Sequence, residues 1–435
     1  MIRKASPPGW RQCTMADLFK VKHGFAFDGK YFASEGEYVL LSPGNFNDAG
    51  GFKLKDKEKY FTGDIPEEYV LSEGDLLVAM TEQAEGLLGS SALIPSSNRF
   101  LHNQRLGLIT DWKATEIDLR FLYYLFNTRE VRTQIRASAT GTKVRHTSPT
   151  RIGEVRVVIP RVETQRTIAS VLSAYDSLIE NNDRRIAILE EMAQSLYREW
   201  FVEYRFPDYE ITRFVDSPLG RIPKGWGCTT VGDLCSLMRA GGTPERKNEA
   251  YWSGGSIDWY KTKELQDCFL LGSEEQITEI AATNSTTRLF NQGTILMAIY
   301  GSPTVGRLGI LTKQSACNQA ALAMVPDPAK ASLPFLFHVL LNLRSHFNTI
   351  AAGAAQQNIS KAKVEAATCV LPPPRLIEES DALCRPVFDE LRCLAKKTLL
   401  LRHTRDLLLP KLMSGQLDVE DLDIDTGEPL AGVEA

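Results

Sequence analysis

The hydrophobic positions of the chain first follow a short, irregular rhythm typical of a mixed globular module. Apolar runs at 38–41, 75–79 and 106–109 are separated by turns rich in glycine and asparagine. Such runs predict short β-strands. Apolar residues three and four apart at 119–133 predict a helix among these strands. We therefore expect a first mixed α and β module at 1–160.

A strict heptad rhythm follows this module. Apolar residues recur at alternating spacings of four and three between 168 and 200, with Asn182 inside the stripe. This pattern is typical of a coiled-coil seam, although plain core packing also produces it, and a polar seam residue fixes register. We expect a central spacer helix at 161–206, spanning about 50 Å from 168 to 200. The predicted seam comprises Ile168, Leu172, Ile179, Asn182, Ile186, Leu189 and Leu196.

The same order of features then returns. Gly9-Trp10 reappears as Gly225-Trp226, and Asn103-Gln104 reappears as Asn318-Gln319. Six such matches keep their order, with offsets between 212 and 219, so the chain is an internal duplication. The second copy predicts a strand at 295–299, a helix at 333–347, a module at 207–373, a distal spacer helix at 374–415 and a tail at 416–435. The distal seam contains Leu391, Leu394, Leu401 and Leu408.

These elements predict an α+β fold with two mixed α/β globular domains, each followed by a long helix. The two helices are expected to pack as an antiparallel coiled coil with pseudo-twofold symmetry. Residues 426–430 faintly echo 216–219, the segment that introduces the second module. We therefore expect the tail to lie near the N-terminus and to close a ring-like pseudo-twofold arrangement.

Composition narrows the class of protein. The chain has 435 residues, is 43% hydrophobic and carries a formal net charge of -4. This average does not exclude nucleic-acid binding, which needs only local basic patches. No apolar run is long enough for a membrane helix, and the N-terminus lacks a secretory pattern. The eight cysteines are scattered without C-x-x-C spacing, which predicts reduced cytoplasmic thiols and no metal site.

Catalytic signatures are absent from the sequence. It contains no phosphate-binding loop, no H-E-x-x-H and no G-x-S-x-G. The glycine-rich segment 301–306 is followed by no helix signal with a lysine, which favours an ordinary turn. We therefore predict no catalytic and no metal-ligating residues, although an enzyme with an unrecognised active site stays open.

Several polar loops carry donors suited to nucleic acid. The loop 141–148 contains cationic and hydroxyl side chains, which suit phosphate oxygens, and its counterpart 353–361 contains amides, which can pair with adenine. An ordinary solvated surface explains any one such cluster, but recurrence at matching places in two modules favours DNA contact. The candidate DNA-binding residues are Lys20, Lys22, Lys143, Arg145, His146, Lys261, Lys263, Gln356, Gln357, Asn358 and Lys361.

Three longer strings carry a family resemblance. Residues 217–226 resemble the lead-in to the second target-recognition domain of type I restriction-modification specificity subunits. Residues 189–201 and 402–415 resemble the ends of the central and distal helices of these subunits. The resemblance covers essentially the whole chain and makes the two modules target-recognition domains.

The resemblance implies a non-catalytic DNA-binding subunit of a prokaryotic cytoplasmic restriction system. Each target-recognition domain would read one half of a bipartite asymmetric site in double-stranded DNA. The paired helices would set the spacer and dock two modification (methyltransferase) subunits, which carry S-adenosylmethionine and methylate adenine. Two restriction (motor-nuclease) subunits using ATP and magnesium could join, and this chain would bind no cofactor itself.

Two other hypotheses stay open beside this one. The chain could be a non-catalytic protein-interaction scaffold with two binding modules, or a fused enzyme. Steep salt dependence of duplex binding favours the DNA reader over the scaffold. Methyl transfer by the isolated chain would favour the fused enzyme.

Overall fold

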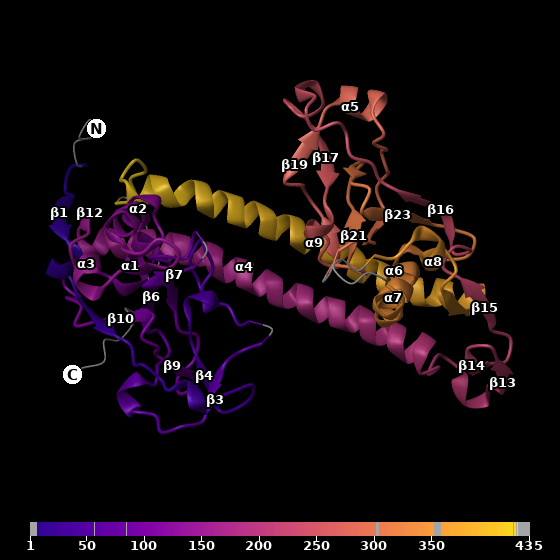
Figure 1. Ribbon diagram of the computed structural model, residues 1–435, viewed down its shortest axis with the longest axis horizontal. Helices are drawn as coiled ribbons and strands as arrows, with labels where there is room; N and C mark the ends of the chain where they lie inside the picture. Colours follow the sequence, from indigo (N-terminus) through magenta and orange to yellow (C-terminus); the bar gives the residue numbers. More distant parts are fainter. Residues whose placement is uncertain are drawn as a thin grey trace. The chain divides into compact units, whose positions relative to one another are not determined.

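The computed structural model describes residues 7–55, 57–83, 85–301, 304–351, 358–420, 422 and 424. The chain forms two compact units, of which one comprises 1–178 with 401–435 and the other 179–400. Of the candidate DNA-binding residues, Gln356 and Gln357 lie outside the described residues. The helices are α1 (Leu119–Phe126), α2 (Arg129–Ser138), α3 (Pro149–Gly153), α4 (Val162–Tyr197), α5 (Glu279–Asn284), α6 (Leu333–Asn342), α7 (Arg344–Ile350), α8 (Lys361–Glu365) and α9 (Pro374–Met413) (Figure 1).

The first module is built around a four-stranded sheet of order β2-β10-β6-β8. A second four-stranded sheet has the order β3-β5-β4-β9, and two-stranded ladders join β1 to β12 and β7 to β11. β6 is buried at all four positions, as its unbroken apolar run predicts. The strands are β1 (Arg11–Thr14), β2 (Lys20–His23), β3 (Phe32–Ala33), β4 (Tyr38–Leu40), β5 (Tyr60–Phe61), β6 (Leu76–Ala79), β7 (Thr81–Glu82), β8 (Ser91–Leu93), β9 (Phe100–Leu101), β10 (Leu106–Thr110), β11 (Arg145–His146) and β12 (Arg156–Ile159).

The second module repeats this plan with a five-stranded sheet of order β16-β23-β20-β21-β18. A smaller sheet has the order β19-β17-β22, and ladders join β13 to β14 and β15 to β24. Its strands are β13 (Phe214–Ser217), β14 (Gly220–Pro223), β15 (Gly227–Thr230), β16 (Cys235–Ala240), β17 (Ile257–Tyr260), β18 (Cys268–Leu270), β19 (Glu275–Ile277), β20 (Ile295–Ala298), β21 (Leu308–Leu311), β22 (Ala316–Cys317), β23 (Ala321–Pro326) and β24 (Thr368–Leu371).

The internal duplication extends to individual hydrogen bonds. The ladders β1–β12 and β15–β24 are both antiparallel, and each joins an early strand of its module to the last strand of that module. At the end of the first strand, the Thr14 hydroxyl donates to the Asp17 carboxylate at 2.7 Å. The Thr230 hydroxyl donates to Asp233 at 2.8 Å in the same way. The repeated sequence therefore encodes a repeated frame.

The single helix predicted at 119–133 is two helices, so that prediction was wrong in its length. Thr128 has extended backbone angles, and its hydroxyl accepts from the Val131 amide, which caps α2 and separates it from α1. The second copy, predicted at 333–347, is likewise divided into α6 and α7 at Leu343. The apolar spacing continued across both breaks because all four helices bury residues in the module cores.

The residues of both predicted seams are buried or partly buried. α4 runs into a π-helical turn at Arg198–Val202, and Asn182 is 8% exposed within its seam. Thr398 in α9 is buried in the same way. None of the predicted seam residues is exposed: Ile168, Leu172, Ile179, Asn182, Leu391 and Leu394 are buried, and Ile186, Leu189, Leu196, Leu401 and Leu408 are partly buried.

Each unit contains contacts between its own parts of α4 and α9. In the first unit, Ile168 and Leu172 share a core with Leu412. In the second unit, Ala193 shares a core with Phe388. Figure 1 shows both helices as long continuous ribbons.

The segment that follows α9 packs within the first unit. Gly415 lies beside Pro7 and Trp10, so closely that a Cβ at this position would meet both side chains. Val419 is 2% exposed in the core of the first unit, and Glu420 pairs with Arg161 at 3.0 Å. Gly415, directly before the predicted tail, therefore lies beside the N-terminal region, and residues 421, 423 and 425–435 of the tail lie outside the described residues.

No described helix is long and apolar enough to cross a membrane. The eight cysteines are all free thiols. Burial raises the pKa of Cys268 to about 11, with smaller contributions from Glu190 and Asp267, so its thiol stays protonated. A search of the described residues finds no cluster of His, Cys, Asp and Glu that could hold a metal ion.

Candidate nucleic-acid interface

The polar loop of the first module is closed by two backbone hydrogen bonds. The Thr140 amide donates to the His146 carbonyl at 2.9 Å, and the His146 amide donates back at 2.8 Å. Gly141 turns the chain with a φ of 95°. A Cβ there would collide with the Val144 carbonyl oxygen, so only glycine fits this turn.

Three candidate residues are exposed on this loop. Lys143, Arg145 and His146 all lie at its surface. Within the described part of the chain, neither Lys143 nor Arg145 has a carboxylate within ion-pair distance. Their donors are therefore available to an external anion such as a DNA phosphate.

The loop is attached to one end of the central sheet. The Thr147 amide donates to the Met80 carbonyl at 2.9 Å, and the Met80 amide donates to the Arg105 carbonyl at 3.0 Å. This pair of bonds places the loop beside the end of β6 and the turn that precedes β10. The sheet therefore holds the loop and the turn as neighbours.

The second module has the same attachment. The Ile359 amide donates to the Ile299 carbonyl at 2.9 Å, and the Ile299 amide donates to the Ala320 carbonyl at 2.9 Å. Asn358, exposed, forms a β-bridge with Tyr300 at this place. Asn358, a residue of the predicted amide-rich loop 353–361, therefore lies beside the end of β20, as the loop of the first module lies beside the end of β6.

The two lysines of β2 lie on this sheet but differ in position. Lys20 pairs in register with Thr110, at the far end of β10 from the turn, and forms an ion pair with Asp111 at 3.0 Å. Lys22 donates to the Glu68 carboxylate at 3.0 Å and lies 4.5 Å from the centre of the Tyr69 ring. The structure therefore does not bring Lys20 to the polar loop.

The lysines of the second module are already paired with carboxylates. Lys261 donates to Glu275 at 2.7 Å and to Glu274 at 2.9 Å, and Lys263 pairs with Glu274 at 2.7 Å. The hydrogen bonds that Lys261 donates to Glu275 and Glu274 raise its pKa. Lys361, at the start of α8, pairs with Glu365 at 3.0 Å. These three lysines are weaker candidates for phosphate contact than Lys143.

A buried histidine supports the turn before β10. His102 is fully buried, and its Nε2 lies 2.9 Å from the Leu106 carbonyl oxygen. Burial lowers the pKa of His102 to about 4, so the ring is neutral at pH 7. The neutral ring then carries its proton on Nε2 and donates it to Leu106.

Sequence reasoning missed the exposed residues of this turn. Gln104 and Arg105 lie at its surface, and Gln319 occupies the matching place in the second module. The signal was present, because Asn103-Gln104 and Asn318-Gln319 are one of the repeated pairs. From the sequence alone, this match indicates only a shared scaffold.

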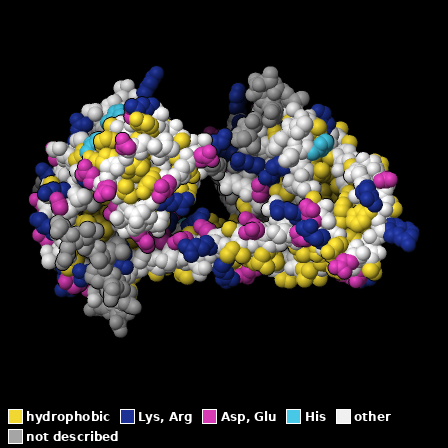
Figure 2. All heavy atoms as spheres, turned by 90° about the horizontal axis from the view of Figure 1, so that it is seen from below, with side chains coloured by type: hydrophobic (Ala, Val, Ile, Leu, Met, Phe, Trp, Pro, Cys, Tyr) yellow, Lys and Arg dark blue, Asp and Glu magenta, His cyan; other side chains and the backbone are white. Residues whose placement is uncertain are grey.

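Charges of both signs are interspersed elsewhere. On the face shown in Figure 2, Lys and Arg side chains stand among Asp and Glu side chains. This mixture agrees with the net charge of -4. A nucleic-acid interface would therefore be a local group of basic residues.

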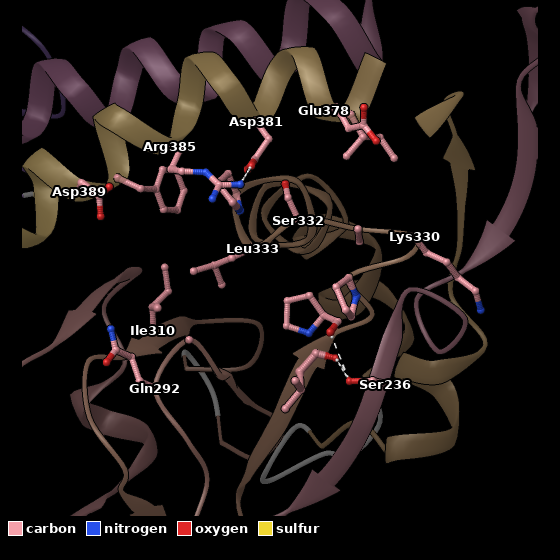
Figure 3. Close-up of a pocket in the computed structure, with 18 of the residues that line it drawn as sticks. Ser236, Gln292, Ile310, Lys330, Ser332, Leu333, Glu378, Asp381, Arg385 and Asp389 are labelled. Carbon is pink, nitrogen blue, oxygen red and sulfur yellow. Dashed lines mark hydrogen bonds and ion pairs between the residues drawn. The ribbon is translucent and has the colours of Figure 1, made fainter. Parts of the chain in front are cut away.

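A separate hollow lies inside the second unit. A cavity of about 800 Å³ is lined by the loop before α6 and by the first turns of α9. Figure 3 shows Ser332 and Leu333 opposite Asp381, which pairs with Arg385. No candidate DNA-binding residue among those described lines this cavity.

Comparison with protein families gives one match across both modules. The family described as type I restriction modification DNA specificity domain matches residues 7–191 and 223–379. The chain is 28% identical over 305 residues to the type I restriction enzyme MjaIX specificity subunit of Methanocaldococcus jannaschii, covering 69% of this chain and 70% of that protein. It is 22% identical over 375 residues to the putative MjaX specificity subunit of the same organism, covering 83% of each.

A solved structure shares the fold. The S subunit of a type I restriction-modification system from M. genitalium aligns with a TM-score of 0.62 and 16% identity, covering 95% of this chain and 97% of that one. At this identity the likeness concerns the fold. It agrees with an α+β chain of two modules and long helices.

Proposed function

The chain belongs to the type I restriction-modification DNA specificity family, and from this premise we propose that it gives such an enzyme its DNA sequence specificity. Each module reads one half of a bipartite asymmetric site in double-stranded DNA. Direct reading of base edges distinguishes sequences, while phosphate contacts hold each module in position.

One observation carries the proposal: the two modules keep one frame and change the side chains displayed on it. The same backbone bonds attach both polar loops to their sheets, through Met80 in the first module and Ile299 in the second. The first loop displays Arg145, and the second displays Asn358. Two copies of one frame with different exposed groups suit two different half-sites.

We further propose that α4 and α9 form an antiparallel coiled coil that sets the spacer. Arg405 pairs with Asp176 at 2.6 Å in the first unit, and Arg185 pairs with Glu390 at 2.7 Å in the second. The later residue of α4 meets the earlier residue of α9, which supports antiparallel pairing. On this proposal, 161–206 and 374–415 separate target-recognition domains at 1–160 and 207–373 in a pseudo-twofold arrangement.

The same helices are proposed to dock two modification subunits. Exposed apolar side chains remain along them, which favours a protein partner. They are Leu178, Ile188, Met192, Leu383, Leu399, Leu400 and Leu407. S-adenosylmethionine would then be bound by these partners, and ATP and magnesium by two motor-nuclease subunits that join them. This chain acts in the prokaryotic cytoplasm without a cofactor or catalytic residues of its own.

The salt dependence of duplex binding tests the proposal. The complete chain with its modification subunits is titrated with a mixed-sequence DNA duplex at several salt concentrations. For a DNA-binding protein with several phosphate contacts, the logarithm of the binding constant falls linearly with the logarithm of the salt concentration. The slope is about -0.9 for each phosphate neutralised. A protein-interaction scaffold would bind no duplex, and that result would overturn the proposal.

A further inference from the structure

The turn before β10 and its counterpart before β23 have one geometry. In the first module, the Asn103 carbonyl accepts from the Leu106 amide at 2.9 Å, and its side-chain oxygen accepts from the Arg105 amide at 3.1 Å. In the second, Asn318 accepts from Ala321 at 3.1 Å and from Ala320 at 3.2 Å. We call residues 103–106 and 318–321 the asparagine turns.

Close backbone packing fixes both turns. Gly24 and Gly241 lie so near the carbonyl groups of Asn103 and Asn318 that neither position has room for a Cβ. The carbonyl of Arg105 is also bound by the Met80 amide. The middle residues of each turn are therefore displayed from a rigid backbone, as precise recognition requires.

The first turn lies beside groups suited to phosphate. The bonds through Met80 connect it to the loop that displays Lys143 and Arg145. His23, exposed at the end of β2, pairs in register with Gly107 next to the turn. A duplex held by these donors would meet the middle residues of the turn.

The two turns differ at one middle position. Gln104 and Gln319 are the same residue in both turns and cannot distinguish two half-sites. Arg105 is exposed and, among the described residues, has no carboxylate within ion-pair distance. The matching residue, Ala320, offers only a methyl group. At this position the side chain differs between the modules, while the backbone hydrogen bonds are the same. Recognition of different bases by two modules of one fold requires such a difference.

We propose that Arg105 is a base-reading residue of the first module, with guanine as its target, and that Ala320 holds the same place in the second module. An arginine pairs with guanine through O6 and N7 in the major groove, whereas an alanine contacts the thymine methyl. The inference rests on the proposed function and deepens it.

The test maps methylated positions in a random-sequence DNA library. The complete chain, with its modification subunits and S-adenosylmethionine, is compared with Arg105→Ala, Arg105→Gln and Ala320→Arg. Each Arg105 variant should reduce the preference for guanine at one position of one half-site by at least about fivefold, leaving the other half-site unchanged. Ala320→Arg should create a guanine preference in the other half-site.

Arg156→Ala is the matched control, because Arg156 is an exposed arginine of the same module on the separate β1–β12 ladder. Its motif should equal that of the original chain. The inference is overturned if the Arg105 variants lower methylation of all sequences equally or leave both half-sites unchanged. Failure of the proposed function looks different, since the original chain would then direct methylation to no two-part motif.

Discussion

His102 is a titratable group whose charge is controlled by burial. Its pKa of about 4 lies below the ordinary value of 6.5, because the apolar surroundings disfavour the charged ring. Below pH 6.5 the unfolded chain takes up a proton at this residue, and the folded chain does not until about pH 4. The contribution of neutral His102 to the free energy of unfolding is therefore complete above pH 6.5 and declines as the pH falls towards 4.

This linkage predicts a loss of stability in mild acid. Between pH 7 and pH 4.5 the first unit should lose about 2 kcal/mol through His102, part of a full effect of about 3 kcal/mol. His102→Gln should remove this part of the pH dependence. Urea unfolding at the two pH values measures it, and equal pH dependence in both proteins would contradict the assignment.

Lys143 and Arg145 are predicted to contact phosphates. Replacing either with alanine should weaken duplex binding for all sequences and should reduce the salt slope by about 1. Lys263→Ala is the control, because Lys263 already pairs with Glu274. Fluorescence titration against two unrelated duplexes measures the change. Loss of discrimination at a single base would show that the replaced residue reads sequence instead.

The sequence identified candidate basic side chains, but it did not predict which of them pair with carboxylates. Lys143 and Lys261 are both lysines in polar loops, and no pattern separates them. Only folding brings Glu274 and Glu275 to Lys261 and leaves Lys143 without a described carboxylate. Arg105 was missed because its importance depends on a turn whose partners, such as Met80, are distant in sequence.

At the scale of elements, Asp176 joins three helices of the first unit. Its carboxylate accepts from the Tyr124 hydroxyl of α1 at 2.6 Å and from Arg405 of α9 at 2.6 Å. Burial alone would lower the pKa of Arg405, but the hydrogen bonds that it donates to Asp176 and Asp406 outweigh burial and raise this pKa above its ordinary value. Arg405 therefore stays charged beside Asp176.

Asp176→Ala should destabilise the first unit by about 2 kcal/mol, because the buried Tyr124 hydroxyl loses its acceptor and the partly buried Arg405 keeps only Asp406. Arg184→Ala is the matched control. Its ion pair with Glu180 is largely exposed, so its removal should change stability by less than about 0.5 kcal/mol. Urea unfolding of both variants measures the difference. Equal stabilities would contradict a structural role for Asp176.

The heptad pattern predicted the long helices well because their seam is set locally, by spacing along one element. The division of the shorter helices into α1 and α2, and into α6 and α7, was harder to predict from the sequence. A run of apolar residues from Leu119 onward does not show that Thr128 leaves the helical conformation and caps a new helix. That choice depends on how α1 and α2 each pack against the module core, which a periodic pattern does not contain.

At the scale of the whole molecule, the internal duplication predicts two DNA-recognition modules. The two long helices predict a fixed distance between the half-sites that these modules recognise. Repeated residues identified the shared frame from the sequence because they keep the same backbone role in both modules, as Asn103 and Asn318 illustrate. The residues that read bases could not be found in this way. They are by nature the positions at which the repeats differ.

The proposed role of α4 and α9 in setting the spacer predicts how the length of the spacer depends on the length of the helices. Inserting one heptad into both helices at matched seam positions should lengthen each by about 10 Å. The unspecified spacer should grow by about three base pairs, with both half-sites unchanged. Mapping of methylated positions measures the spacer. An unchanged spacer in a folded, active complex would refute the role of the helices.

The central claim is that one chain reads two different half-sites. It is tested most directly by sequencing methylated adenines in DNA exposed to this chain with its modification subunits and S-adenosylmethionine. A chain with two different readers should give one asymmetric motif, with two specified parts separated by a fixed number of unspecified bases. A single continuous motif, or methylation without sequence preference, would contradict it.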